Sequence, residues 1–416
     1  MRLEDLKERE QPFLVDDVPW MQVLPRYDGP WLGGVAQSIG RLLGAPPTAP
    51  ELPDGYLPRA LTDGVRRVAL VIADAFGYVE LTEALAQGRF PGVVRRLDAG
   101  EALLRPVTSC FPSTTCVALT ALATGQAPAV TGQIGFTVFL EGGVGNLLRW
   151  QWASDGRPLE MEPETWLPVP SVSQRLVDAG AAANVLLPAA IASSALVRMR
   201  SRGARVVPTG SPQGVFAVLA EMLEATRGEK AYIEAYWSNV DASAHVYGPG
   251  SAAHRLEIAV LDLSLAETVL ALPPQGDALV IITADHGQVR NDPALRVDLT
   301  ERPRVLEALA GPPAGERRVL YLKAGQGGVA SAMAVLEAEL GDKAWFVTAE
   351  EAWRRGVFGP PALPRSPRVG DIIGFARPGV QLHYPFQEQE RGHSHAGSHG
   401  GLTRREMLVP FLALRV

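Results

Sequence analysis

Residues 68–77 read Val68-Ala-Leu-Val-Ile-Ala-Asp74-Ala-Phe-Gly77, six apolar residues that run directly into an aspartate. A continuous apolar run of this length is typical of a strand buried on both faces, as in the parallel sheets of α/β proteins. In such open sheets, ligands bind beyond the carboxyl ends of the strands, which is where Asp74 stands. The stretch therefore predicts an α/β fold with a polar site at the end of this strand.

Strand-like and helix-like segments alternate along the rest of the chain. Apolar residues recur at helical spacing over Ala252–Leu272, which gives the longest expected helix. The alternation predicts a mostly parallel central sheet with helices on both faces. Further strands are expected at Leu103–Thr108, Asn184–Leu187, Tyr232–Trp237, Leu279–Thr283, Val319–Leu322 and Leu408–Val416.

Three parts of the chain depart from this alternation. Residues 1–63 are rich in Pro, Gly and short polar runs, and we expect an extended N-terminal arm that lies on the core. The rest of the chain, residues 64–416, is expected to form one α/β domain. Within it, residues 290–380 are expected to include a small insert. Residues 132–151 interrupt the alternation and are interpreted as a hairpin or a lid.

Charge and cysteine content exclude several classes of protein. Lys and Arg number 39 against 45 Asp and Glu, a net charge of −6, which argues against a surface that binds nucleic acids or anionic membranes. The two cysteines, Cys110 and Cys116, are too few for a disulfide framework or a cysteine-based zinc site. Residues 1–10 are charged, and no uninterrupted apolar run reaches the ~18 residues of a membrane span. We therefore expect a cytoplasmic protein without a membrane anchor.

Residues that suit a metal site follow several of the expected strands. Asp74 and the pair Asp285-His286 come directly after strands, and Asp241 lies shortly after another. Asp241 and His245 are four residues apart, which brings both side chains to one side of a helical turn. Each signal alone is weak, because an aspartate at a strand end is more often a cap or turn residue. Together, at one edge of one sheet, they favour a dinuclear site for Zn²⁺, with Mn²⁺ as the other metal that such ligands bind.

Two further segments each have two interpretations. The hydroxyls of residues 113–115 open an expected helix, where a hydroxyl serves either as an N-cap or as a metal-activated nucleophile beside bound phosphate. The Gly-rich segment 391–401 holds His393, His395 and His399, and it forms either a flexible loop or a fold around a metal ion.

The motifs follow one another in this order: Val68 to Gly77, Phe111-Pro-Ser-Thr-Thr115, Ala123-Thr-Gly125, Asp241-x-x-x-His245-x-x-Gly248-Pro249, Thr283-Ala-Asp285-His286-Gly287, and His399-Gly-Gly-x-x-x-x-Glu-Met-Leu-Val-Pro410. Their order and spacing resemble those of the alkaline phosphatase superfamily. Within it, the chain is similar to the nucleotide pyrophosphatase/phosphodiesterase branch from about residue 66 to the C-terminus. The resemblance implies an alkaline phosphatase-like catalytic domain over residues 64–416.

The resemblance also implies a function and a set of site residues. It implies hydrolysis of a phosphodiester or phosphoanhydride bond in a small phosphorylated substrate, through a covalent phosphothreonine. Thr115 is the implied nucleophile, and Thr114 is the second candidate. Two divalent metal ions, usually zinc, are implied, one held by Asp74, Thr115, Asp285 and His286 and the other by Asp241, His245 and His399.

The chain departs from the family pattern just after the nucleophile helix. Typical nucleotide pyrophosphatases carry an Asn there that donates to a phosphate oxygen, but no Asn occurs between Thr115 and Asn146, and Gln133 is the amide nearest the expected place. Three other functions therefore stay open: a phosphomonoesterase or a phosphonate hydrolase with the same site, and a metal- or phosphate-binding protein without catalysis. A sulfatase is rejected, because Thr114 replaces the Arg of the sulfatase motif.

Overall fold

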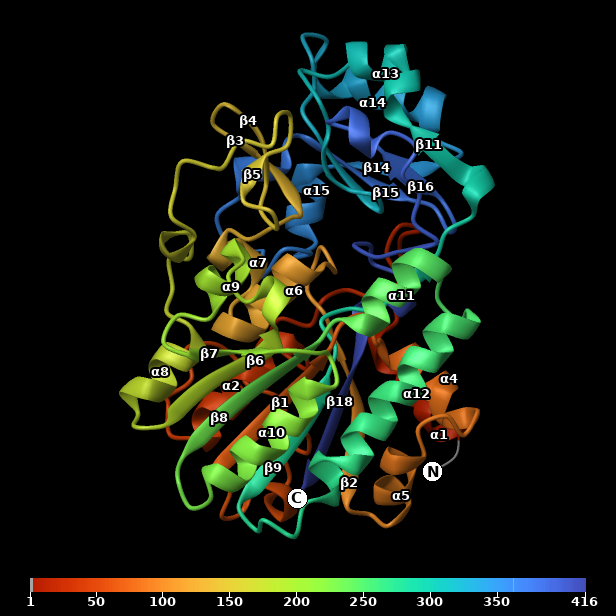
Figure 1. The fold of residues 1–416 in the computed structure, drawn as a ribbon. Coiled ribbons are helices and arrows are strands. Elements are labelled where there is room, and N and C mark those ends of the chain that lie inside the picture. Colours follow the sequence, from red (N-terminus) through yellow and green to blue (C-terminus); the bar gives the residue numbers. More distant parts are fainter. Residues whose placement is uncertain (1–2, 362) are drawn as a thin grey trace.

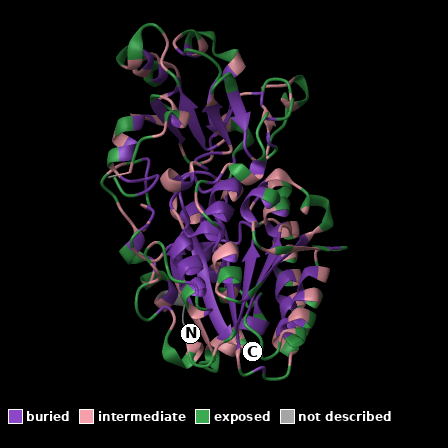
Figure 2. Cartoon of the chain, turned by 90° about the vertical axis from the view of Figure 1, so that its left-hand side faces the viewer, coloured by how far each residue is buried: buried purple, intermediate pink, exposed green. Residues whose placement is uncertain are grey.

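The computed structural model describes residues 3–361 and 363–416, and two seven-stranded sheets organise these residues. The sheet that contains residues 67–73 is called the central sheet, and the one that contains residues 314–316 is called the upper sheet. In Figure 1 the upper sheet lies above the central one, and the helices α6 (Thr115–Thr124) and α11 (Asn239–Tyr247) lie between them. Figure 2 shows that the core is centred on the central sheet, most of whose strands are buried.

The central sheet is parallel except for one strand. Its order is β2-β18-β9-β1-β8-β6-β7, and β18 runs antiparallel to both of its neighbours. This arrangement confirms the expected mostly parallel sheet. Its strands are β1 (Arg67–Ala73), β2 (Ala102–Thr108), β6 (Ala182–Pro188), β7 (Arg205–Thr209), β8 (Ala231–Trp237), β9 (Ala278–Thr283) and β18 (Leu408–Arg415).

Strand β1 lies in the middle of the central sheet, and all of its residues are buried. Its unbroken apolar sequence suits this place, because other side chains cover both faces of the strand. Ala73, its last residue, pairs with Trp237 at the end of β8, and Ile72 pairs with Thr283 at the end of β9. The register therefore brings the segments that follow these three strands to one edge of the sheet.

Helices cover both faces of the central sheet. In Figure 1, α10 (Gly214–Ala225) and α12 (Ala252–Glu267) lie in front of the strands, and α2 (Leu32–Leu42) lies behind them. The sequence predicts one helix over 252–272, but α12 ends at Glu267 because Thr268 leaves the helical backbone, with φ −119° and ψ −83°. No helix in the described ranges combines the length and the apolar character that crossing a bilayer requires. The other α-helices are α1 (Leu3–Glu8), α3 (Arg59–Thr62), α4 (Tyr78–Ala86), α5 (Pro91–Asp98), α7 (Pro128–Thr131), α8 (Val172–Asp178), α9 (Ala195–Arg200), α13 (Pro303–Glu307), α14 (Gly328–Leu340), α15 (Ala349–Arg354) and α16 (Arg404–Met407).

Two distant segments of the chain build the upper sheet, which is antiparallel. Residues 137–152 form a hairpin and a short third strand, and residues 314–376 supply the other four strands. Gly315 pairs with Thr137 and joins the two segments. In sheet order the strands are β14 (Ala344–Thr348), β15 (Ile372–Ala376), β13 (Val319–Leu322), β12 (Ala314–Glu316), β3 (Thr137–Leu140), β4 (Gly143–Asn146) and β5 (Gln151–Trp152). Two short ladders pair β10 (Val289–Arg290) with β17 (Gly397–Ser398), and β11 (Arg296–Asp298) with β16 (Gln381–His383).

The N-terminal segment differs from the extended arm that the sequence predicts over residues 1–63. Residues 32–42 form α2, an 11-residue helix that is buried over most of its length. Three glycines lower the helix propensity of this stretch, which is why its sequence does not indicate a helix. Gly33 is required by packing, because a Cβ there would lie 2.1 Å from the Trp31 ring. A domain boundary at residue 63 stays a prediction.

Two motif glycines touch where β1 and β9 end. A Cβ on Gly77 would lie 3.0 Å from the Cα atom of Gly287. A Cβ on Gly287 would lie 2.0 Å from the carbonyl oxygen of Arg405 in α16. Three backbone segments therefore meet without room for a side chain, which explains the glycine in both motifs.

We expect Gly287→Ala to lower the free energy of unfolding by about 1–3 kcal/mol, because the added methyl group meets backbone atoms that cannot move independently. Gly311→Ala is the matched control, since a Cβ at Gly311 meets nothing within 4 Å. Chemical denaturation of both variants measures the difference. Equal stabilities of the two variants would contradict the close backbone packing at Gly287.

Candidate metal centre

The carboxyl edge of the central sheet gathers the predicted site residues from separate segments. Asp74 follows β1, and Asp285 and His286 lie just beyond β9. Asp241 and His245 are on α11, which follows β8. The remaining two lie outside this set of strands: Thr115 is the first residue of α6, and His399 follows β17. The structure thus brings six of these residues together in two clusters and places the seventh, Thr115, beside one of them.

The first cluster consists of Asp74, Asp285 and His286, all of them buried. Their ligand atoms lie within 4.8 Å of one another. Nε2 of His286 is 3.6 Å from Oδ1 of Asp74 and 3.5 Å from Oδ2 of Asp285. This spacing leaves room for one ion between two carboxylates and one imidazole.

Each carboxylate of the first cluster has one oxygen in use and one free. Oδ2 of Asp74 accepts the Tyr236 hydroxyl, and Oδ1 of Asp285 accepts the amides of Ala75 (3.1 Å) and His286 (2.9 Å). Oδ1 of Asp74 and Oδ2 of Asp285 are buried, and neither has a hydrogen-bond partner among the described residues. Buried carboxylate oxygens without a partner are costly, and a bound cation satisfies both of them.

The electrostatics of the first cluster also favour a cation. Burial, reinforced by the neighbouring charge of Asp285, raises the pKa of the Asp74 carboxyl well above its ordinary value. The shift expresses first the loss of solvent around the carboxylate and then its repulsion by the neighbouring carboxylates. A divalent ion between the carboxylates would lower their pKa and hold them ionised.

The second cluster consists of Asp241, His245 and His399, which are half-buried. Oδ1 of Asp241 is 3.3 Å from Nε2 of His245 and 3.8 Å from Nε2 of His399. Gln288 donates its side-chain amide to the same carboxylate. Burial lowers the pKa of His399 well below its ordinary value, so its imidazole is neutral, as a metal ligand requires.

All three histidines present the same ring nitrogen to the clusters. In each, Nδ1 lies within hydrogen-bond distance of a backbone carbonyl oxygen, which places the proton on Nδ1 and leaves Nε2 as a lone-pair donor. Such contacts fix the tautomer and the ring orientation of metal-binding histidines. The contacts are His245 to Gly397 at 2.9 Å, His399 to Ser113 at 3.1 Å and His286 to Gly287 at 3.2 Å.

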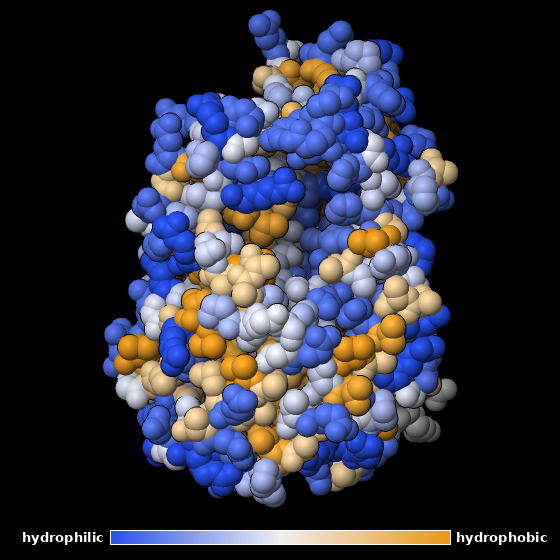
Figure 3. Space-filling view, in the orientation of Figure 1, coloured by the Kyte–Doolittle hydropathy of each residue, from blue (hydrophilic) through white to orange (hydrophobic). Residues whose placement is uncertain are grey.

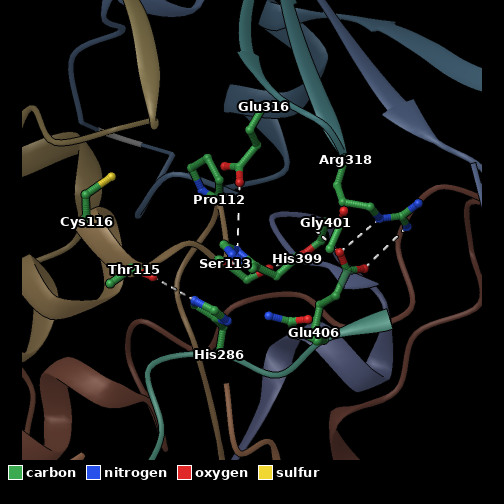
Figure 4. Close-up of polar contacts among 12 residues, drawn as sticks. Pro112, Ser113, Thr115, Cys116, His286, Glu316, Arg318, His399, Gly401 and Glu406 are labelled. Atoms are coloured by element: carbon green, nitrogen blue, oxygen red, sulfur yellow. Dashed lines mark hydrogen bonds and ion pairs between the residues drawn. The ribbon is translucent and has the colours of Figure 1, made fainter. Parts of the chain in front are cut away.

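Thr115 is the hydroxyl that faces the clusters. Its Oγ1 lies 3.2 Å from Nε2 of His286, and Figure 4 shows the side chain pointing toward that ring. The Ser113 hydroxyl donates to the Gly401 carbonyl at 2.7 Å, and Thr114 interacts with the carboxyl group of Glu316. Thr114 occupies the N-cap position of α6 without a side-chain cap hydrogen bond. The cap interpretation of these hydroxyls therefore has no contact to support it.

Three residues at the site were not predicted from the sequence. Tyr236 and Gln288, which orient Asp74 and Asp241, stand beside motifs and carry no signal of their own. Glu316 comes from the upper sheet, and its Oε2 lies 3.8 Å from Nδ1 of His399. Figure 4 shows it reaching the site from the side opposite His286.

A cavity of about 440 Å³ opens from Thr115 and the second cluster toward the upper sheet. Figure 3 shows this face of the molecule hollowed between the two sheets. Thr115, His245 and His399 line one end of it, and Phe136 and Asn146 of the hairpin line a wall. Sequence reasoning points to Gln133 as the amide near the nucleophile, but the lining amide on the hairpin is Asn146, because β4 pairs with β3 and carries it there.

The other described histidines belong to neither of the two clusters. His395 lines the cavity with its Nδ1 3.0 Å from that of His245, and His393 also lines it. His254 is buried on α12, 3.5 Å from Glu80. Within the described ranges, the metal-type clusters thus contain one of the three histidines of segment 391–401.

Solved structures with similar folds come from hydrolases. Phosphonoacetate hydrolase from Sinorhizobium meliloti 1021, in complex with phosphonoformate or phosphonoacetate, matches with a TM-score of 0.62 and 21% identity, over 85% of this chain and 90% of that one. Murine ectonucleotide pyrophosphatase/phosphodiesterase 5 matches with a TM-score of 0.59 and 16% identity, over 83% and 87%. These matches confirm the expected alkaline phosphatase-like fold.

Sequence comparisons assign the family. No curated protein is similar enough in sequence to this chain to count as a match. The family described as type I phosphodiesterase / nucleotide pyrophosphatase matches residues 68–402, which is most of the chain. The match confirms the branch that the motifs indicate, and the chain belongs to the type I phosphodiesterase / nucleotide pyrophosphatase family, whose members are hydrolases.

Proposed function

We propose that this chain hydrolyses phosphodiester or phosphoanhydride bonds of small phosphorylated substrates, with Thr115 as the nucleophile at a dinuclear zinc centre. The observation that carries the proposal is the position of Thr115. Its hydroxyl lies 3.2 Å from Nε2 of His286, at the start of α6 and at the floor of the cavity. No other hydroxyl of residues 113–115 is placed in this way.

The residues present fit two divalent ions. The proposed ligands are three carboxylates, three imidazoles and one hydroxyl, a set that suits Zn²⁺ and also binds Mn²⁺. Three carboxylate charges against the four positive charges of two ions leave the site positive, which favours an anionic phosphoryl group. The proposed ligands are Asp74, Thr115, Asp285 and His286 for one ion, and Asp241, His245 and His399 for the other.

The reaction proceeds in two displacements at phosphorus. Thr115 Oγ, after losing its proton to solvent, forms a bond to phosphorus while the bond to the leaving oxygen breaks, and the electron pair stays on that oxygen. Water then attacks the phosphothreonine, and the P–Oγ bond breaks. When bound, the metal ions supply charge neutralisation for the attacking and leaving oxygens. The N-terminus of α6, which begins at Thr115, favours a bound anion such as a phosphoryl group.

Phosphonate hydrolysis is the second candidate function. It is favoured by the structural similarity to phosphonoacetate hydrolase, whose solved complexes contain phosphonoacetate and phosphonoformate. A substrate panel separates the candidates: bis(p-nitrophenyl) phosphate, p-nitrophenyl phosphate and phosphonoacetate, each with the zinc-loaded protein. We expect the diester to be preferred. A preference for the monoester or for phosphonoacetate would replace the proposed function and retain the site.

Thr115→Ala is expected to reduce diester turnover by on the order of 10⁴-fold or more, because it removes the nucleophile. Thr114→Ala is the matched control, since it removes the neighbouring hydroxyl, which interacts with Glu316 instead of His286. Steady-state kinetics of both variants, with metal content measured alongside, make the comparison. Near wild-type turnover by Thr115→Ala would exclude this residue as the nucleophile.

Removal of metal is expected to abolish turnover, and zinc is expected to restore it. Titration of the metal-free protein with Zn²⁺ in a calorimeter should give two equivalents per chain, and binding should raise the melting temperature because only the folded state holds both sites. Asp74→Asn and Asp241→Asn should each remove one equivalent, whereas Glu160→Gln, an exposed carboxylate far from both clusters in sequence, should remove none. Two equivalents in both cluster variants would refute the ligand assignment.

A further inference from the structure

The cavity is lined by a guanidinium group that the proposed reaction does not use. Arg317 stands in the turn between β12 and β13, directly after Glu316. Its Nη1 donates to the side-chain oxygen of Gln381 and to the carbonyl oxygen of His393, which lies 3.1 Å away. Both acceptors are neutral. In the described part of the chain, no carboxylate lies within 4.0 Å of this guanidinium.

Arg317 is a cation in a place that disfavours charge. Burial and the nearby Arg296 lower the pKa of Arg317 to about 10, so the group is still protonated at neutral pH. The carboxylate of Glu390, which also lines the cavity, acts on this charge from beyond 4.0 Å and offsets its burial only in part. Guanidinium groups recognise carboxylates and phosphates through paired hydrogen bonds. An anion in the cavity would supply a hydrogen-bonded counter-ion in addition to the neutral acceptors.

Arg317 and Thr115 line the same cavity, and contacts through the metal clusters connect their surroundings. Thr115 contacts His286, whose ring stacks on that of His399 at a centroid distance of 3.8 Å. His399 lies 3.8 Å from Glu316, the residue next to Arg317. A substrate that occupies this cavity with its phosphorus at Thr115 can therefore bring its leaving group to Arg317.

The walls of the cavity are largely apolar. They include Phe136 and Leu148 from the hairpin segment, Leu320 from β13, and Leu382 and Phe386 from the segment around β16. Such walls favour an apolar group by excluding water from it. The occupant suggested by the cavity is thus an apolar body with an anion at its far end.

We propose that Arg317 binds an anionic group, a carboxylate or a phosphate, on the leaving group of the substrate, separated from the reacting phosphorus by an apolar spacer. This inference rests on the proposed function and adds the substrate class to it. The competing explanation is structural: through Gln381 and His393, Arg317 holds the segment that leads to His399. A structural role would affect all substrates equally, whereas an anion site would affect only those with the second charge.

The test uses three aryl diesters with the zinc-loaded protein: methyl phenyl phosphate, methyl 4-carboxyphenyl phosphate and methyl 4-(phosphonomethyl)phenyl phosphate. Released phenol is measured for wild type, Arg317→Gln, Arg317→Lys and the control Arg296→Gln, whose side chain does not line the cavity. We expect the wild type to prefer a charged substrate in kcat/KM. We expect Arg317→Gln to reduce that preference by about tenfold or more, mainly through KM, because charge-assisted hydrogen bonds are lost. Arg317→Lys should retain part of the preference for a charged substrate, and Arg296→Gln should retain all of it.

The two charged substrates show whether the site takes a carboxylate or a phosphate-like group. An unchanged preference in Arg317→Gln, or an equal loss of kcat on all three substrates, would overturn the anion site and leave the proposed function standing. If the wild type hydrolyses none of the three, the proposed function fails, and calorimetric binding decides the inference separately. In that measurement Arg317→Gln should weaken the binding of methyl 4-carboxyphenyl phosphate and leave the binding of methyl phenyl phosphate unchanged. If wild type and Arg317→Gln bind methyl 4-carboxyphenyl phosphate equally well, the anion site is refuted.

Discussion

The burial of two carboxylates at the ends of neighbouring strands is the constraint on which the site depends. Asp74 and Asp285 follow β1 and β9, are removed from solvent, and each keep one oxygen without a partner among the described residues. Such an arrangement is unfavourable in the absence of a cation. The surrounding contacts hold it in place: Tyr236 and two backbone amides fix the other oxygens, and glycines allow the turns to meet. A protein that maintains this repulsion has its stability coupled to metal binding.

Because of this constraint, the two sheets contribute different residues to the site. The central sheet supplies carboxylates in fixed register, because buried parallel strands cannot slip without exposing their apolar residues. The upper sheet supplies no residue of either metal-type cluster within the described ranges, yet Glu316 and Arg317 reach the cavity from it. A buried ion pair of Arg318 and Glu406, at 3.1 Å, ties the two parts together beside His399, as Figure 4 shows. The proposed metal ligands therefore come from the central sheet and its connecting segments, and the proposed substrate contact of Arg317 comes from the upper sheet.

The sequence predicts the central sheet and brings the seven proposed site residues into one expected site, because these depend on local patterns. Asp74, Asp285 and His286 follow apolar strands. The order of the motifs indicates the other four proposed site residues. The residues of the cavity wall could not be predicted from the sequence. Asn146 and Glu316 are brought to the cavity by the pairing of segments about 170 residues apart, and such long-range pairing has no local sequence signal. Helix α2 was missed because glycine lowers its propensity, and packing against the core overrides that cost.

The place of β18 has a consequence for how the chain folds during synthesis. This strand lies between β2 and β9, inside the central sheet, although it is the last one along the sequence. Until it leaves the ribosome, β9 and β2 have no partner on the facing edges, and those edges are open to pairing with other nascent chains. Because His399 also comes late, the second metal cluster cannot assemble before the sheet is ready to close. Completion of the central sheet and completion of the site thus depend on the same late segment, residues 399–415.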